Sequence, residues 1–364
     1  MPSSPVRPSS EGSELDFRVP DGINGKGFPP SFGELSRRLM IGLIASMFFR
    51  QGESADPWES SMIFGQDFSA PTLGGKQFWT DCFIHGDWRI QQNAVSGDFR
   101  LLDDRNFRRA AGTYESCRER FEKFKADLDL PPLKKTVVLT IHGLGRTRNA
   151  MRGLADSLVD HGEWSSINVS YASTRQSVAQ HAAALKRIVE NLEGAETVHL
   201  VGHSLGNIVI RHYLGDRNRD PQSSVRNLPT VGRVVMLAPP NNGSAVARIL
   251  KENKLFQWVM GTTGQELGAT WDQLQPRLAV PEDFGIIAGS LRDGAGANPL
   301  IPGDDDLVVA VEETKLPGAN DFLTVPAAHT FIMDSPEVRA AVLNYLREGC
   351  FRSSGEKDPL PRNP

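Results

Sequence analysis

The sequence predicts an α/β fold in which a mostly parallel, doubly wound sheet is flanked by helices. From residue 133 onward, short apolar runs alternate with helix-like stretches, as expected of βαβ units. The runs are continuous and rich in Val, Ile and Leu, which is typical of parallel strands buried on both faces. Sheets of this kind hold their sites at the carboxyl ends of the strands.

The first predicted strand is Thr136–Ile141 (TVVLTI), and His142 and Gly143 follow it at once. The second is Ile167–Tyr171. A capping box formed by Ser173 and Gln176 is expected to begin the next helix. Apolar residues then recur at helical spacing: Val178, Ala182, Leu185, Ile188, Val189 and Leu192.

The third strand, Thr197–Val201, enters the turn Gly202–Gly206, and a helix is predicted over Leu205–Leu214. Three further strands are predicted at Arg233–Leu237, Phe284–Ala288 and Phe322–Val325. The last helix is defined by Ser335 as N-cap, Pro336 in the first turn and Gly349 past the end.

With 364 residues, the chain has room for about two domains. Residues 133–351 are predicted to form one catalytic domain, preceded by an N-terminal elaboration over 59–132. In the elaboration, Asp87–Gln91 and Phe99–Leu102 are expected to be strands and Tyr114–Leu128 a helix.

The two ends, residues 1–58 and 352–364, are expected to be largely disordered. Both are rich in Pro and polar residues, so they cannot bury enough apolar surface to become ordered. Within the first segment, residues 39–49 form an apolar run preceded by Arg37 and Arg38, as in a signal peptide. A helix that packs on the main domain is the alternative for this run. The run is too short to span a bilayer. Localisation stays open, with the cytoplasm favoured over export or membrane association through 39–49.

The charge and the cysteine content exclude several classes of protein. The 40 Lys and Arg against 44 Asp and Glu give a net charge of −4. This argues against a nucleic-acid partner, which requires a basic surplus to neutralise phosphates. Cys82, Cys117 and Cys350 are too few and too scattered for a disulfide framework or a metal site. We expect no metal and no cofactor, and leave open one Cys82–Cys117 bridge in an oxidising compartment.

The central motif is Gly202-x-Ser204-x-Gly206. It lies between a β-branched strand and a helical run, which is the setting of a nucleophile elbow. There the serine occupies a strained turn, and its hydroxyl meets a helix N-terminus that favours developing negative charge. The alternative is a tight strand-to-helix turn that carries a serine by chance.

A serine nucleophile needs a base, and in this arrangement the base is a histidine that follows the serine in the chain. Only His212 and His329 follow Ser204. His212 would lie about 12 Å along the elbow helix, at ~1.5 Å per residue, so it cannot reach back. His329, in a loop before the last helix, is therefore the predicted base.

The acid that orients the histidine should lie between Ser204 and His329 in the chain. Asp306 is the first choice, Asp305 the second and Asp293 the third. Because adjacent carboxylates repel one another, at most one of Asp304, Asp305 and Asp306 is expected to point inward. A solvated acidic loop or a weak calcium site is the alternative for this run.

The oxyanion hole needs two backbone N–H donors. One is expected from Leu205, after the nucleophile, and the other from Leu144 in the loop after the first strand. His142 is expected to brace this loop, and His203 is expected to take no part.

These residues resemble the α/β-hydrolase lipases and esterases, and in particular a bacterial branch with an HGLG loop and a GHSLG elbow. The segments that agree are Tyr171–Arg175, Leu237–Ser244, Gly261–Gly268 and Val325–Phe331. Two positions depart from the family pattern. Asn207 stands where a second glycine is common, and Leu307 stands where a glycine usually follows the acid.

The resemblance implies an α/β-hydrolase fold and a serine hydrolase that cleaves carboxylic esters through an acyl-enzyme on Ser204. An acyltransferase with the same triad and a catalytically inactive binding protein are the alternatives. The expected partner is a small-molecule or lipid ester, and the oligomeric state is not predicted. Residues 243–281 are expected to form a lid, or else an ordinary extra helix.

Overall fold

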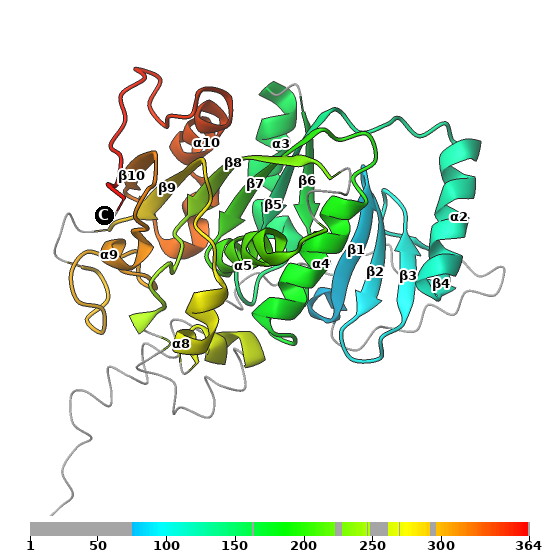
Figure 1. Cartoon of the computed structure of the whole chain (residues 1–364), viewed down its shortest axis with the longest axis horizontal. Helices are drawn as coiled ribbons and strands as arrows, with labels where there is room; N and C mark the ends of the chain where they lie inside the picture. The colour runs from blue at the N-terminus through cyan, green and yellow to red at the C-terminus, as the bar shows by residue number, and fades with distance from the viewer. Residues whose placement is uncertain are drawn as a thin grey trace, which may run out of the picture. The chain divides into compact units, whose positions relative to one another are not determined.

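The computed structural model describes residues 75–161, 164–222, 228–245, 247, 261–268, 270–291 and 296–362. The expected disordered segment 1–58 with its apolar run 39–49, Asp293 and part of the expected lid (246, 248–260 and 269) lie outside these ranges. The described chain forms a four-stranded antiparallel sheet and a six-stranded parallel sheet (Figure 1). Within it, no helix has the length and apolar content that a membrane span requires.

The parallel sheet has the strand order β10-β9-β8-β7-β5-β6. Its strands are β5 (Thr136–Ile141), β6 (Ser165–Val169), β7 (Thr197–His203), β8 (Thr230–Leu237), β9 (Phe284–Gly289) and β10 (Asp321–Val325). Every neighbouring pair is parallel. Each was predicted as a strand, but β6 begins and ends two residues earlier than expected.

Helices cover both faces of this sheet. The main ones are α3 (Arg152–His161), α4 (Val178–Glu190), α5 (Leu205–Arg219) and α10 (Pro336–Glu348). Figure 1 shows α4 and α5 on one face, and α3 and α10 pack on the other. On that second face one apolar core joins Leu154 of α3, Val235 of β8 and Val342 of α10. Burial of such side chains stabilises the fold by about 2 kcal/mol each.

The chain reverses direction across the sheet between β6 and β7. It passes from β5 through α3 to β6 at one edge, and then returns through α4 to β7. Right-handed crossovers in opposite directions place their helices on opposite faces, so the carboxyl ends of β5 and β7 lie at the point where the strand order reverses. Ile141 pairs with Gly202 there, which brings the loop after β5 level with the turn after β7.

The predicted capping box of α4 is wrong by four residues. Ser177 is the N-cap, and its hydroxyl accepts from Gln180 N at 3.3 Å while Gln180 Oε1 accepts from Ser177 N at 2.9 Å. The Ser-x-x-Gln pattern occurs twice in succession, and the first copy belongs to a turn. There Ser173 N donates to Tyr171 O, and Ser173 Oγ accepts from Gly145 N.

Prediction and structure agree on the last helix, α10. Ser335 Oγ accepts from Val338 N at 3.5 Å, Pro336 is the first residue, and Gly349 ends the helix with φ +74°. The short helices are α8 (Trp271–Leu274), α9 (Val311–Thr314) and the 3-10 turns Gly75–Phe78, Arg148–Met151, Gln275–Arg277 and His329–Asp334.

Residues 352–362 are not a disordered tail as expected. Leu360 O accepts from Gly318 N and Leu360 N donates to Ala319 O, both at 2.9 Å. Asp358 N donates to Asp321 Oδ1, also at 2.9 Å. These hydrogen bonds hold the segment beside β10, and composition alone does not reveal them.

The antiparallel sheet has the order β1-β2-β3-β4 and carries the helix α2. Its elements are β1 (Trp79–His85), β2 (Trp88–Asn93), β3 (Phe99–Leu102), β4 (Arg108–Gly112) and α2 (Tyr114–Asp127). It has an apolar core of its own, in which Phe83, Ile90 and Leu101 pack against Phe121. Cys82, Cys117 and Cys350 are free thiols, so the Cys82–Cys117 bridge is not formed.

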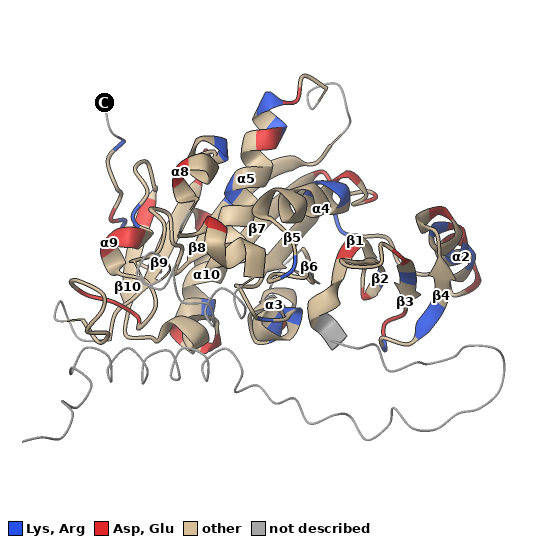
Figure 2. Ribbon diagram, turned by 90° about the horizontal axis from the view of Figure 1, so that it is seen from below, with Lys and Arg blue, Asp and Glu red and all other residues tan. Residues whose placement is uncertain are grey.

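A buried ion pair joins this sheet to the end of β6. Arg89 Nη1 and Asp81 Oδ2 lie 2.8 Å apart and are 2% and 0% exposed. Asp81 Oδ2 also accepts from Ser170 N at 2.7 Å, and Arg89 donates to Asn168 O. Figure 2 shows charged residues of both signs along outer helices such as α2, whereas β5 and β7 contain no Lys, Arg, Asp or Glu. The buried charges of Asp81 and Arg89 are therefore paired with each other.

Candidate active site

Ser204 lies in a strained turn between β7 and α5. Its φ of +51° and ψ of −121° fall where non-glycine residues rarely occur. A side chain on Gly206 would collide with the carbonyl oxygen of Ile141, and one on Gly202 would collide with Asn207. Both glycines of the motif are thus required for close packing. The strained turn holds the Ser204 hydroxyl at the N-terminus of α5.

The structure brings Ser204, His329 and Asp306 into one hydrogen-bond chain. His329 Nε2 lies 2.9 Å from Ser204 Oγ, and His329 Nδ1 lies 2.7 Å from Asp306 Oδ2. Since the carboxylate can only accept, Nδ1 carries the proton and Nε2 is free to accept from the hydroxyl. His329 and Asp306 are 2% and 0% exposed, so water competes little for these bonds.

Backbone groups fix the orientation of the Asp306 carboxylate. Its Oδ1 accepts from Val308 N at 3.0 Å and from Val309 N at 2.7 Å, which leaves Oδ2 for His329. The Asp306 carbonyl also accepts from His329 N at 2.9 Å. A Cβ on Gly289, the last residue of β9, would lie 2.8 Å from Asp306 Cβ, so the acid sits at the end of that strand.

The other predicted acids and the second candidate base lie elsewhere. Asp305 accepts from the backbone N–H groups of Ala297, Asn298 and Leu307, and it shapes its own loop. Asp304 accepts from Ser290 Oγ at 2.5 Å. His212 pairs with Asp216 at 3.0 Å. Among the described residues, no group of three or more His, Cys, Asp or Glu is arranged to hold a metal ion.

The loop after β5 passes directly beside Ser204. A Cβ on Gly143 would lie 3.1 Å from Ser204 Cβ, which places the adjoining Leu144 next to the nucleophile. Leu205 begins α5, so its N–H belongs to the first turn, where backbone donors lack partners within the helix. The two predicted oxyanion donors therefore belong to segments that meet at Ser204.

Three side chains hold the 142–146 loop in place. Tyr171 Oη donates to His142 O at 2.6 Å, and Ser173 Oγ accepts from Gly145 N at 3.0 Å. Gln77 Nε2, from the N-terminal elaboration, donates to Arg146 O at 2.8 Å. His142 stacks on the Tyr171 ring at 4.3 Å, and burial lowers its pKa to about 4. The neutral His142 thus braces the loop, as expected.

His203 is not the bystander that we expected. Its Nε2 donates to the carbonyl oxygen of His329 at 2.9 Å, and the two rings lie 5.0 Å apart. A Cβ on Gly143 would lie 2.9 Å from His203 Nδ1, so His203 sits between the 142–146 loop and His329. Burial lowers its pKa well below the usual value, so the ring is neutral. No local pattern signals a contact between residues this far apart in the chain.

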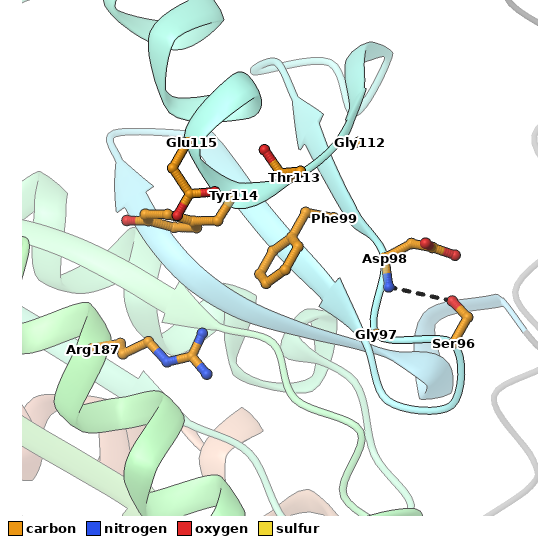
Figure 3. A pocket seen from close by; sticks show the side chains of 9 residues that line it. All are labelled: Ser96, Gly97, Asp98, Phe99, Gly112, Thr113, Tyr114, Glu115 and Arg187. Carbon is orange, nitrogen blue, oxygen red and sulfur yellow. Dashed lines mark hydrogen bonds between the residues drawn. The ribbon is translucent and has the colours of Figure 1, made fainter.

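A cavity of about 510 Å³ lies at the antiparallel sheet and not at Ser204. Phe99 of β3 and Tyr114 of α2 line it, and Arg187 of α4 faces them (Figure 3). No histidine is among its lining residues, so its hydroxyl groups have no imidazole base. The chemistry of the Ser204 site has no counterpart in this cavity.

The parallel order of the central sheet, the helices on both its faces and the turn at Ser204 define an α/β-hydrolase fold. Residues 156–263 match the model of a family described as "Alpha/beta hydrolase of unknown function (DUF900)". No curated protein matches the chain.

Several solved structures are similar to the chain. The lin2722 gene product of Listeria innocua is 17% identical over 63% of this chain and 99% of that chain, with a TM-score of 0.42. Bacillus licheniformis lipase BlEst2 in mature form is 20% identical over 56% and 88% of the two chains, with a TM-score of 0.42. A metagenomic carboxyl esterase is 17% identical over 55% and 65%, with a TM-score of 0.39.

Proposed function

We propose that this protein is a serine hydrolase that cleaves carboxylic esters through an acyl-enzyme on Ser204. The observation that carries the proposal is the hydrogen-bond chain from Ser204 Oγ through His329 to Asp306, at 2.9 and 2.7 Å. A hydroxyl, an imidazole in the correct tautomer and a buried carboxylate are the three groups that acyl transfer requires.

In the first half of the reaction, Ser204 Oγ attacks the ester carbonyl carbon while His329 Nε2 takes the hydroxyl proton. The carbonyl electron pair moves to the oxygen, and a tetrahedral intermediate forms. When it collapses, the bond to the alcohol oxygen breaks and the imidazolium returns the proton to the leaving alcohol. Asp306 stays ionised, holds the ring and stabilises the imidazolium.

In the second half, water replaces the alcohol. His329 takes a proton from the water, which attacks the acyl carbon, and Ser204 leaves with that proton as the free acid is released. We assign the oxyanion donors to the backbone N–H groups of Leu144 and Leu205. Each such donor is worth about 10²–10³ in kcat, because it meets charge that develops only in the transition state.

The test is hydrolysis of p-nitrophenyl esters of increasing chain length by the wild type, Ser204→Ala and Ser116→Ala. Ser116 is exposed on α2, so its variant controls for the loss of a hydroxyl. We expect Ser204→Ala to lower kcat by at least about 10⁴-fold with the fold unchanged by circular dichroism. Ser116→Ala should keep wild-type rates.

Two outcomes would count against this function. Retained hydrolysis in Ser204→Ala would exclude Ser204 as the nucleophile. If an added alcohol acceptor gave new ester in place of free acid, the protein would be an acyltransferase and not a hydrolase.

A further inference from the structure

The positive charge of Arg146 acts on His203, the residue that precedes the candidate nucleophile. Arg146 ends the 142–146 loop, in which Gly143 lies against both Ser204 and His203. Both the backbone N–H and the backbone carbonyl of Arg146 form hydrogen bonds. Arg146 N donates to Gly143 O at 3.3 Å, and its carbonyl accepts from Gln77 Nε2 at 2.8 Å.

Two nitrogen atoms of the Arg146 guanidinium are buried without a partner in the described part of the chain. The residue is 5% exposed, and its Nε and Nη2 atoms have no hydrogen-bond partner within the described part of the chain. Burial lowers the pKa of this group, yet an arginine keeps its proton at neutral pH. An ionised group in this position costs free energy unless an opposite charge meets it.

Among the described residues, the titratable groups near Arg146 do not supply that charge. His142 and His203 are both kept neutral, because burial and the charge of Arg146 lower their pKa values. Asp334 is the acid whose charge acts on Arg146. Its carboxylate bonds instead to Arg339 Nη2 at 3.4 Å and is 49% exposed. The positive charge at Arg146 therefore has no bonded carboxylate in the described part of the chain.

We propose that Arg146 binds the anionic group, a carboxylate or a phosphate, of an acidic ester whose carbonyl is attacked by Ser204. This rests on the proposed ester hydrolysis. The guanidinium offers paired N–H donors that match the oxygens of either anion. Because Arg146 is buried, the attraction is stronger than in water. A neutral ester leaves the charge unpaired, so the anion determines specificity.

The kinetic test compares acidic esters with neutral ones of matched shape. On the acyl side, p-nitrophenyl hydrogen glutarate is compared with p-nitrophenyl pentanoate. On the alcohol side, a 1-acylglycerol 3-phosphate is compared with the 1-acylglycerol. We expect the wild type to prefer the acidic member of one pair by about 100-fold in kcat/KM, as a charged hydrogen bond gives. The preferred pair identifies the source of the anion.

Two variants and one control separate binding from structure. Arg146→Met removes the charge but keeps much of the side-chain volume. Arg146→Lys keeps the charge but lacks the paired N–H donors of the guanidinium. Arg152 is exposed, so Arg152→Met is the control. Arg146→Met should lose the preference for the acidic ester about 100-fold, measured as the ratio of kcat/KM for the acidic and the neutral ester. The preference of Arg146→Lys for the acidic ester should lie between those of the wild type and Arg146→Met. Arg152→Met should have the wild-type preference.

A binding measurement keeps the inference independent of turnover. In Ser204→Ala, glutarate or inorganic phosphate should raise the midpoint of thermal unfolding, and the added Arg146→Met change should abolish that shift. Without anion, Arg146→Met should unfold at a higher temperature than its parent, because an unpaired buried charge is removed.

The outcomes separate this inference from the proposed function. Equal hydrolysis of acidic and neutral esters, with no thermal shift by either anion, would overturn the role of Arg146 and leave ester hydrolysis intact. Anion-dependent stabilisation that requires Arg146, in a protein that hydrolyses no ester, would support the anion site and overturn the proposed function.

Discussion

His203 Nε2 donates a hydrogen bond of 2.9 Å to the carbonyl oxygen of His329, although the two residues are 126 positions apart in the chain. His203 precedes the candidate nucleophile and His329 is the candidate base, so this bond fixes the two segments relative to each other. Both rings are almost fully buried. His203 therefore acts as a positioning residue for the Ser204–His329 pair.

Replacing His203 should impair the chemical step more than substrate binding. We expect His203→Phe, which has no donor, to lower kcat about 10-fold or more with little change in KM, because small misplacements of a base are costly. His203→Gln keeps an N–H donor and should recover most of the loss. Equal loss in both variants, or a change confined to KM, would contradict the positioning role.

Substitution of Asp306 should lower activity, whereas substitution of Asp305 should lower stability. Asp306→Asn removes the carboxylate that fixes the His329 tautomer, so kcat should fall about 10⁴-fold at neutral pH while stability changes little. Asp305→Asn weakens the acceptor of three backbone N–H groups, so it should lower the unfolding temperature and leave kcat within about 3-fold. Steady-state kinetics and thermal unfolding check both. The reverse pattern would make Asp305 the acid.

The positive φ of Ser204 should be measurable as stored strain. Such a conformation costs about 1–3 kcal/mol, whereas glycine loses about 0.5–1 kcal/mol more chain entropy on folding. We therefore expect Ser204→Gly to exceed Ser204→Ala in free energy of unfolding by about 1 kcal/mol in urea titrations. Both variants lack the Ser204 hydroxyl, so the comparison reports on stability alone. A less stable glycine variant would show that the turn is not strained.

Buried His142 should make the protein sensitive to mild acid. Burial lowers its folded-state pKa to about 4, against an ordinary value near 6.5 in the unfolded chain. Between these two values the unfolded state binds more protons, so stability falls as pH falls from 6.5 to 4. The loss is about 3 kcal/mol from this residue.

The pH dependence is tested with urea titrations from pH 7 to 4 on the wild type and His142→Gln. Between pH 6.5 and 4, the free energy of unfolding should depend less steeply on pH in the glutamine variant than in the wild type. The difference in slope should be up to about 1.4 kcal/mol per pH unit. Control titrations above pH 7 should give parallel curves for the two proteins. An unchanged slope below pH 6.5 would mean that His142 is not kept neutral by the fold.

Much of this fold and site could be predicted from the sequence because its signals are local. Strand β5 is a continuous β-branched run and was predicted with correct bounds. The motif at Ser204 sits between a strand and a helix, and His329 followed by elimination. These predictions depend on spacing and periodicity, which do not require knowledge of distant contacts.

What could not be predicted depends on tertiary contacts. Strand β1 is buried throughout, but Asp81 interrupts its apolar pattern, and only the ion pair with Arg89 explains that burial. Strand β4 is short, charged and partly exposed, so it lacks the signature of a strand. The contacts of His203 and the unpaired burial of Arg146 also arise only when separate segments meet.

The measurement that tests the central claim most directly is mass spectrometry of the protein quenched during turnover of a p-nitrophenyl ester. We expect the mass of one acyl group on the peptide that contains Ser204, and its absence from Ser204→Ala under the same conditions. Two results would contradict the claim that Ser204 is the nucleophile. One is turnover with the acyl group on another residue. The other is a burst of p-nitrophenol release with no acyl-enzyme detected.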